Sequence, residues 1–360
     1  MRSLLLLNDV HLGVKRSAGT TPASAEALRA SLQQAFEDTI YKHLDKDLCI
    51  VGDLFDAFEV EIEDVLKCYF ALSKWLQWMN NGRMLYLVAG NHDIGKRNDK
   101  LSSFDVLAQI LVDAFPDRVV VIREGLETVR GDLNVHAIPH CMNQDLFNIE
   151  MEKALSAAPG YLLLHANVDN GFAENSDHSL NVDAEWLTRL SKKHTLLFAH
   201  EHQHRIMHYD HNSIIMMGNQ WPSSVADCLA HGDAQRDGRK LAHVITPENG
   251  IEVIETWQRN GDFIEMDWTD IKDVTERFVR VTGTASAAQA SDVISAIARY
   301  RAKSPAFVIA NGVKVDGVQG MDDLAEVSFG QVKSFDVLKA LLELLEPEEA
   351  NVVRELLEVA

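Results

Sequence analysis

The sequence predicts an α/β fold for most of the chain, followed by a smaller second unit. Over the first 200 residues, short apolar runs alternate with longer amphipathic ones, the pattern of repeated β-α-β units around a buried sheet. Several apolar runs end in histidine, aspartate or asparagine, where an α/β sheet places its functional loops. The 360 residues exceed what one hydrophobic core usually organises, so we expect a large domain and an appendage.

The elements of the first 200 residues follow one another in a regular order. Short apolar runs predict strands at residues 4–7, 48–51, 84–89, 119–122, 133–138, 161–164 and 195–199. Longer amphipathic stretches predict helices at residues 25–44, 62–79, 101–115, 145–156 and in the later part of 180–190. The alternation indicates a largely buried sheet with helices packed against it.

Beyond residue 200 the pattern changes to strands. Apolar β runs at residues 206–208, 214–217, 242–245 and 251–254 are expected to complete a second sheet. An acidic, polar stretch at 262–273 then separates residues 1–260, the expected large domain, from a small unit at 270–330. Within that unit, strand, helix and strand patterns lie at residues 278–281, 287–301 and 307–309.

Residues 333–360 predict a terminal pair of helices. Ser334 is placed to cap the first helix, and Pro347 ends it. Both helices carry apolar stripes that must be buried against a surface. That surface is either the chain's own domain or a partner, and the sequence leaves both possibilities open.

Charge, cysteine usage and hydropathy narrow the class of protein. The formal net charge of −20 argues against holding phosphate polymers by bulk electrostatics, so a polyanionic substrate would need a local positive site. The four cysteines form no C-x-x-C pair and suggest a reducing, cytoplasmic setting. No apolar run reaches the roughly 20 residues of a membrane span, and the leucines near the N-terminus are expected to form a strand rather than a leader.

Five short polar motifs follow predicted strands in sequence order. They are Asp9-Val-His11, Gly52-Asp53-Leu-Phe-Asp56, Gly90-Asn91-His92-Asp93, His165, and Ala199-His200-Glu-His202. Two side chains spaced by one residue point to the same side of an extended segment. Two divalent ions held about 3.5–4 Å apart need a bridging carboxylate and several further oxygen or nitrogen ligands. Glycine in two of the motifs allows sharp turns and leaves room for an ion and a phosphate.

This ordered set of motifs, over residues 5 to 205, resembles the calcineurin-like metallophosphoesterase superfamily. The resemblance implies a four-layer α-β-β-α sandwich, with the small C-terminal α+β unit and the terminal helices appended to it. It also implies two overlapping sets of metal ligands. The ligands of the first metal would be Asp9, His11, Asp53 and His202. Those of the second would be Asp53, Asn91, His165 and His200, so that Asp53 bridges.

The resemblance assigns roles to three further side chains. His92 matches the catalytic histidine that contacts the substrate phosphate and can protonate the leaving oxygen. Asp56 and Asp93 fit supporting roles, in which they orient imidazole rings. The family's usual glycine before the last histidine pair is Ala199 here. His204 continues the alternation of His200 and His202, so the last pair could be 202/204, although 200/202 follows the apolar strand directly.

The donor types also bear on the metal. Carboxylate, imidazole and amide ligands suit Mn²⁺ or Fe²⁺ and tolerate Zn²⁺, and histidine-rich shells disfavour Mg²⁺ and Ca²⁺. We therefore expect two divalent ions, with Mn²⁺ as the first choice. No P-loop, G-x-S-x-G motif or zinc-finger spacing supports a competing chemistry.

The motifs alone leave the phosphoester substrate open. Three features resemble the SbcD-like branch, which is the nuclease subunit of a double-strand-break repair complex. They are the Gly-Asp-Leu-Phe-Asp motif, the segment at 217–225, and the order of core, small unit and terminal helices. That branch implies a Mn²⁺-dependent DNA exonuclease and endonuclease in repair and recombination. The alternative is a phosphoesterase acting on nucleotides or small phosphomonoesters. A non-catalytic scaffold is disfavoured because every ligand position is filled.

The same resemblance suggests partners. DNA would be the substrate, an ABC-type ATPase would bind the C-terminal helices, and a homodimer is possible. Local positive charge could come from Lys15 with Arg16 and from Lys96 with Arg97, which flank two of the motifs. Arg299, Arg301 and Lys303 in the small unit could also meet backbone phosphates. Each of these groups could equally be a solvated loop or helix end.

Overall fold

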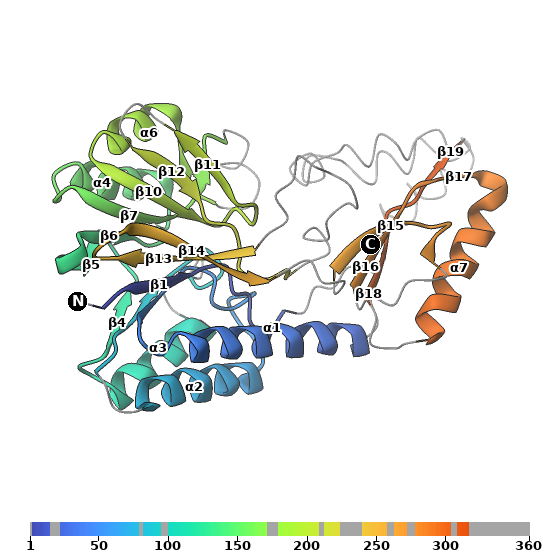
Figure 1. Cartoon of the computed structure of the whole chain (residues 1–360), viewed down its shortest axis with the longest axis horizontal. Coiled ribbons are helices and arrows are strands. Elements are labelled where there is room, and N and C mark those ends of the chain that lie inside the picture. Colours follow the sequence, from blue (N-terminus) through green and yellow to red (C-terminus); the bar gives the residue numbers. More distant parts are fainter. Residues whose placement is uncertain are drawn as a thin grey trace, which may run out of the picture.

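A computed structural model describes residues 2–14, 22–78, 82–94, 100–170, 179–208, 212–223, 240–257, 263–271, 278–303 and 308–316. It shows two six-stranded sheets packed face to face, with helices on both outer sides, and a separate small unit (Figure 1). The predicted α/β class is confirmed. The basic pairs at 15–16 and 96–97 and the segment 333–360, for which helices are expected, lie outside the described residues.

The first sheet has the strand order β14-β13-β1-β2-β3-β4. Its parallel half consists of β1 (Leu4–Leu7), β2 (Asp47–Val51), β3 (Leu85–Val88) and β4 (Val119–Ile122). Next to β1, β13 (Lys240–Thr246) runs antiparallel to β1, and β14 (Gly250–Trp257) runs antiparallel to β13. The expectation that these two runs complete the second sheet is wrong, because β13 pairs with β1 through registers such as Leu5 with Val244.

The second sheet has the order β11-β12-β10-β7-β6-β5. Its strands are β5 (Glu127–Arg130), β6 (Val135–Ile138), β7 (Gly160–His165), β10 (His194–Ala199), β11 (Arg205–His208) and β12 (Ser213–Met216). The four central strands run parallel, and β5 and β11 form antiparallel edges. Strand β5 was not expected from the sequence. A short pair, β8 (Asn167–Val168) and β9 (Asn181–Val182), follows β7.

Three buried apolar layers hold the domain together and define four structural layers. Helices α1 (Pro22–Lys42), α2 (Ile62–Gln77) and α3 (Ser103–Ala114) cover the first sheet, and α4 (Gln144–Ala154) and α6 (Ala184–Ser191) cover the second (Figure 1). Strand β1 contributes to two of these layers, because successive side chains of a strand point to opposite faces of the sheet. Leu5 and Leu7 belong to the cluster under α1, whereas Leu4 and Leu6 belong to the cluster between the sheets.

The small unit has its own core. Strands β15 (Phe263–Asp267), β16 (Phe278–Thr282) and β18 (Val308–Asn311) form a parallel sheet, and β17 (Thr284–Ser286) pairs with β19 (Lys314–Asp316). Helix α7 (Ala290–Lys303) packs on them, with Val281, Ile297 and Tyr300 buried. Strand β15 lies inside the polar stretch expected to be the boundary, so this sheet begins before residue 270.

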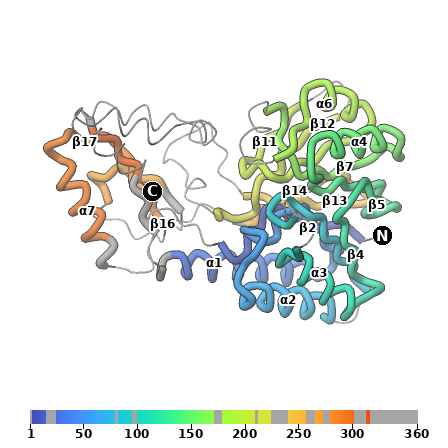
Figure 2. The backbone as a smooth tube through the Cα atoms, turned by 180° about the vertical axis from the view of Figure 1, so that it is seen from behind, coloured from blue at the N-terminus to red at the C-terminus, as the bar shows by residue number. Residues whose placement is uncertain are grey.

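Figure 2 shows the small unit standing apart from the layered domain, with α7 on its outer side. Arg299 lies on α7 and donates from Nε to the Ser295 carbonyl. None of the helices in the described part of the chain combines the length and the apolar character that crossing a bilayer requires.

Candidate metal centre

All seven predicted ligands gather where strands of both sheets end. Asp9 and His11 follow β1, Asp53 follows β2, Asn91 follows β3, His165 ends β7, and His200 and His202 follow β10. Because these strands run parallel within each sheet, their carboxyl ends meet at one edge. Sequence positions 9 and 202 are thereby brought into contact.

Asp9, His11 and His202 form the first half-site. One ligand atom from each lies within 4.8 Å of the others. The Nε2 atoms of His11 and His202 face each other at 3.1 Å. Two imidazole nitrogens at this separation, next to a buried carboxylate, are arranged as ligands of a cation.

Asp53, Asn91, His165 and His200 form the second half-site. Asp53, His165 and His200 again lie within ligand distance of one another. The Asn91 Oδ1 atom lies 2.8 Å from His165 Nε2 and 3.2 Å from His200 Nδ1, and Asp53 Oδ2 lies 3.4 Å from His165 Nε2. Both Asp53 and His165 are 1% exposed. A bridging role for Asp53 stays a prediction.

Backbone N–H groups join the two half-sites. The His200 N–H donates to both carboxylate oxygens of Asp9, at 3.2 and 2.9 Å. His200 therefore ties Asp9 of the first half-site to its own ring in the second. His204, the alternative partner in the histidine pair, lies elsewhere: its ring stacks on His243 at a centroid distance of 5.4 Å.

His92 and Asp56 border the first half-site. The His92 ring stands edge-on to His11 at 5.2 Å, and its Nε2 lies 3.9 Å from Asp53 Oδ2. His92 Nδ1 contacts the Asp56 carbonyl oxygen, which can only accept, so the proton belongs on Nδ1. The Asp56 carboxylate lies 3.4 Å from His11 Nδ1. His92 is thus oriented with Nε2 toward the site and is one-third exposed.

Asp93 belongs to the loop that follows β3 and also carries Asn91 and His92. Its carboxylate accepts from the Gly90 N–H at 2.9 Å, which closes the turn that carries Asn91 and His92. Burial and the neighbouring charge of Asp53 raise the pKa of Asp93 to about 7. Asp93 touches the loop rather than either group of ligand atoms, so the structure places it as a support of the turn.

The backbone at the ligands is strained. Asp9, His11, Asp53 and His200 have φ values of 48°, 51°, 49° and 83°, a region that residues other than glycine rarely adopt. Backbone hydrogen bonds hold the strain in place, from Asp9 N to Gly52 O at 3.1 Å and from His11 N to Asp53 O at 3.0 Å. Such conformations persist where the surroundings over-determine them, as at functional sites.

Two glycines are required by close approach. A Cβ at Gly52 would lie 2.0 Å from His165 Nδ1, and one at Gly90 would lie 2.2 Å from Asp53 Oδ1. Both separations are far below a van der Waals contact. Glycine in these motifs therefore lets β2 and β3 bring their loops against the ligands of the second half-site.

Opposite charges compensate for burial in the second half-site. Burial opposes ionisation of Asp53, but the His165, His92 and His11 rings hold the pKa of its carboxyl well below the ordinary range. Burial likewise opposes protonation of His165, and the Asp53 carboxylate overrides it and raises the pKa of His165 to about 9. A divalent cation would take over the role of the imidazolium as partner of Asp53.

Asn8 and Gln220 also serve the site, and the motifs did not reveal them. The Asn8 side-chain amide donates to Asp9 Oδ2 at 2.6 Å, and the Gln220 amide bonds in turn to Asn8 at two points. All three side chains are at most 1% exposed. The only sequence signals were the position of Asn8 beside Asp9 and that of Gln220 inside the singled-out segment at 217–225.

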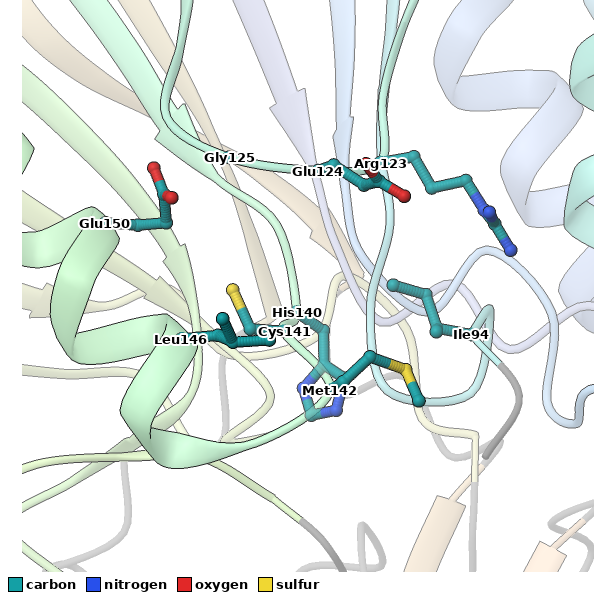
Figure 3. A pocket seen from close by; sticks show the side chains of 9 residues that line it. All are labelled: Ile94, Arg123, Glu124, Gly125, His140, Cys141, Met142, Leu146 and Glu150. Carbon is teal, nitrogen blue, oxygen red and sulfur yellow. The ribbon is translucent and has the colours of Figure 1, made fainter. Parts of the chain in front are cut away.

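A cavity of about 320 Å³ adjoins the loop that carries His92. Ile94 lines it from that loop, and Figure 3 shows Ile94 and Arg123 on one side with Leu146 and Glu150 on the other. His140, also in its wall, donates its backbone N–H to Ala89, at the base of the same loop, at 2.9 Å. The cavity and the metal centre therefore share the segment that follows β3.

The residues present fit two divalent ions. Each half-site presents a buried carboxylate and two imidazoles, and the second adds the Asn91 amide oxygen. The facing Nε2 atoms of His11 and His202 can form a hydrogen bond only if one of them carries a proton and donates it to the other. A cation between them would accept the lone pairs of both. These donors are of the kinds that hold divalent metal ions, and several metals fit them equally well.

The sequence was compared with family models, curated proteins and solved structures. The family model of the calcineurin-like phosphoesterases matches residues 2–223. Among solved structures, vacuolar protein sorting 29 from Cryptosporidium parvum is similar at 13% identity and a TM-score of 0.28, covering 70% of this chain and 95% of its own. A search of curated proteins found no significant match. Since the family model spans more than half of the sequence, including every residue of both half-sites, the chain belongs to the calcineurin-like phosphoesterase family.

Proposed function

We propose that this chain is a Mn²⁺-dependent nuclease of the SbcD type, which hydrolyses phosphodiester bonds in DNA with two metal ions. The observation that carries the proposal is the convergence of both half-sites beside His92, with carboxylate, imidazole and amide ligands in each place that two ions require. Divalent metal-dependent hydrolysis of phosphoesters follows from the family.

The roles of the chain's own groups follow from their positions. When bound, two such ions activate water as a nucleophile and neutralise charge on the phosphate oxygens. Asp9, His11 and His202 would hold one ion. The second half-site, which includes Asp53, would hold the other. His92 is fixed through Nδ1, which keeps its proton on the Asp56 carbonyl, so Nε2 is the atom that would give a proton to the leaving oxygen when the ring enters the reaction as the doubly protonated imidazolium.

Support for DNA as substrate comes from the sequence. The Gly-Asp-Leu-Phe-Asp motif, the segment at 217–225 and the order of core, small unit and terminal helices all resemble the SbcD-like branch. By the same resemblance we propose that residues 333–360 bind an ABC-type ATPase and that the protein serves DNA repair or recombination. A homodimer is compatible with this proposal.

One observation favours a second candidate, a phosphoesterase acting on nucleotides or small phosphomonoesters. The cavity beside Ile94 shares a loop with His92, and its apolar side chains could receive the organic group of a small ester. Polymeric DNA does not require such a recess, because it is usually held along its backbone.

One assay separates the two candidates. The purified chain with Mn²⁺ would be given linear duplex DNA, single-stranded DNA, bis-p-nitrophenyl phosphate and a panel of nucleotides. A nuclease degrades DNA and the bis-ester, and it leaves phosphomonoesters largely intact. Rapid turnover of a nucleotide or a monoester with inert DNA would overturn the nuclease proposal in favour of the second candidate.

A further inference from the structure

The segment after β12 brings an amide side chain beneath the first half-site. Gln220 is fully buried and lies between β12 and β13, whereas Asn8 directly follows β1. The Asn8 backbone N–H donates to Gln220 Oε1 at 2.7 Å, and Gln220 Nε2 donates back to Asn8 Oδ1 at 2.8 Å. The two residues, 212 positions apart, thus form a reciprocal pair.

The orientation of both amides in this pair is determined. A backbone N–H can only donate, so the oxygen of Gln220 must face Asn8 N. The Gln220 Nε2 then faces three acceptors, namely Asn8 Oδ1 and the carbonyls of Gly218 and Leu241, at 2.8, 3.1 and 3.3 Å. With its oxygen occupied by Gln220, Asn8 has only its NH₂ group left to turn toward Asp9.

That NH₂ group selects one oxygen of Asp9. Asn8 Nδ2 donates to Asp9 Oδ2 at 2.6 Å and to the Gly218 carbonyl at 2.9 Å. The His200 N–H also lies nearer to Oδ2, at 2.9 Å, than to Oδ1, at 3.2 Å. The carboxylate is therefore held by one oxygen, and Oδ1 is left with the weaker of the two contacts.

We propose that Gln220 is a positioning residue for the first metal ion, acting through Asn8 to hold the Asp9 carboxylate in its ligating orientation. This inference rests on the proposed function only in taking the half-sites as metal sites. Outer hydrogen bonds of this kind typically change metal affinity by about ten- to a hundredfold. Since no hydrogen bond described for Gln220 reaches the second half-site, its loss should weaken the first half-site alone.

The test is a Mn²⁺ titration followed by electron paramagnetic resonance, which counts bound ions without using activity. The wild-type chain should bind two ions, and Asp9→Asn identifies which step belongs to the first half-site. Gln220→Glu keeps the size but places an oxygen against three acceptors. It should weaken the first-half-site step by about ten- to a hundredfold and leave the other within about threefold.

Gln144 provides the matched control. Its amide clamps a backbone in the same way, accepting from Asn181 N at 2.9 Å and donating to Asn181 O at 2.8 Å and to Asn148 Oδ1 at 2.9 Å. None of these groups is a metal ligand. Gln144→Glu makes the same chemical change at a half-buried clamp, and both Mn²⁺ steps should remain unchanged.

The outcomes separate this inference from the proposed function. A wild-type chain that binds no Mn²⁺ would overturn the metal-dependent function itself. Two bound ions in wild type with an unchanged first step in Gln220→Glu, or an equal loss at both steps, would overturn the inference alone. If Gln220→Glu does not fold, Asn8→Ser removes the amide donor to Asp9 directly, and it must show the same selective loss for the inference to stand.

Discussion

The two half-sites hold similar ligands but are positioned by different kinds of contact. The second half-site is built where central strands of the two sheets meet, with Asp53 and His165 packed against glycines that leave no spare volume. The first depends on polar side chains from the loops, because Asn8 holds Asp9 and Asp56 faces His11. Lys240 also donates to the His202 carbonyl, at 3.3 Å.

This difference predicts two modes of failure. A site positioned by close packing should lose metal affinity when side-chain volume is added, because a protein interior cannot accommodate an extra carbon about 2 Å from a ligand side chain. A site positioned by hydrogen bonds should fail when a donor is exchanged for an acceptor of the same size. Substitutions can therefore be chosen to weaken one half-site and spare the other.

The largest effect is expected for the residue that the two half-sites would share. Asp53→Ala should lose Mn²⁺ at the second half-site, weaken the first, and lower turnover by more than about a hundredfold. The reason is that it removes a buried ligand and leaves His165 without its carboxylate partner. Mn²⁺ stoichiometry by electron paramagnetic resonance measures this. Two ions bound at wild-type affinity would show that Asp53 is not a ligand, and loss of the second ion with the first unchanged would show that it is not shared.

Replacing His92 should separate metal binding from chemistry. His92→Ala is expected to leave both Mn²⁺ steps in place and to lower kcat by about a hundred- to ten-thousandfold, because the group lost is the proposed proton donor. Steady-state kinetics on bis-p-nitrophenyl phosphate, with a parallel Mn²⁺ titration, measure both quantities. An unchanged kcat in His92→Ala would show that His92 takes no part in the reaction. Loss of Mn²⁺ from this variant would show that His92 is a metal ligand.

Gly52→Ala tests the packed half-site. The added carbon would lie 2.0 Å from His165 Nδ1, so it should displace that ring and weaken the second Mn²⁺ step by about tenfold or more. Gly82→Ala is the matched control, since Gly82 also has a positive φ, of 67°, but nothing within 4 Å of the new carbon. Gly82→Ala should cost about 1 kcal/mol of stability and leave both steps unchanged. Equal Mn²⁺ binding in the two variants would argue against the packing account.

The smallest effect concerns a buried histidine outside both half-sites. His243 stacks on His204, is 1% exposed, and has no hydrogen-bond partner for either ring nitrogen among the described residues. Burial, with a smaller contribution from His204, lowers the pKa of His243 from 6.5 to about 3. The unfolded chain therefore takes up a proton below pH 6.5 that the folded chain refuses, and stability falls as pH falls from 6.5 toward 3.

At pH 5 this single group should cost about 2 kcal/mol of the free energy of unfolding relative to pH 7. Urea unfolding at both pH values, with a chelator present, measures the loss. His243→Phe should lose less between pH 7 and pH 5 than wild type by that amount. An identical pH dependence in the two proteins would mean that His243 is protonated equally in the folded state.

Much of the fold was readable from the sequence, because the runs that form its buried strands are short, apolar and regularly spaced. Strand β5 was missed since only Val129 of its four residues is buried, as befits an edge strand. The sheet that receives β13 could not be read either. Its partner β1 lies more than 230 positions away, and sequence patterns report local structure, not which distant strands pair.

The ligand residues could be listed from spacing and family resemblance, whereas their supports could not. Asp9 and His11 lie in a motif directly after a strand, and such a motif can be recognised from the sequence alone. The left-handed backbone at both residues gives no such signal, since the strain is imposed by contacts with the loop after β2. Asn8 and Gln220 are ordinary amides whose pairing exists only after β1 and the segment before β13 have come together.

The place of β1 between β2 and β13 has a consequence for how the protein is made. One neighbour of β1 in the sheet, β2, follows it closely in the chain, yet the other, β13, is translated some 235 residues later, roughly ten to fifty seconds at typical elongation rates. Until then one side of β1 is an open edge. A piece of the chain cut at residue 223, where the family match stops, would keep every ligand and retain that exposed edge permanently.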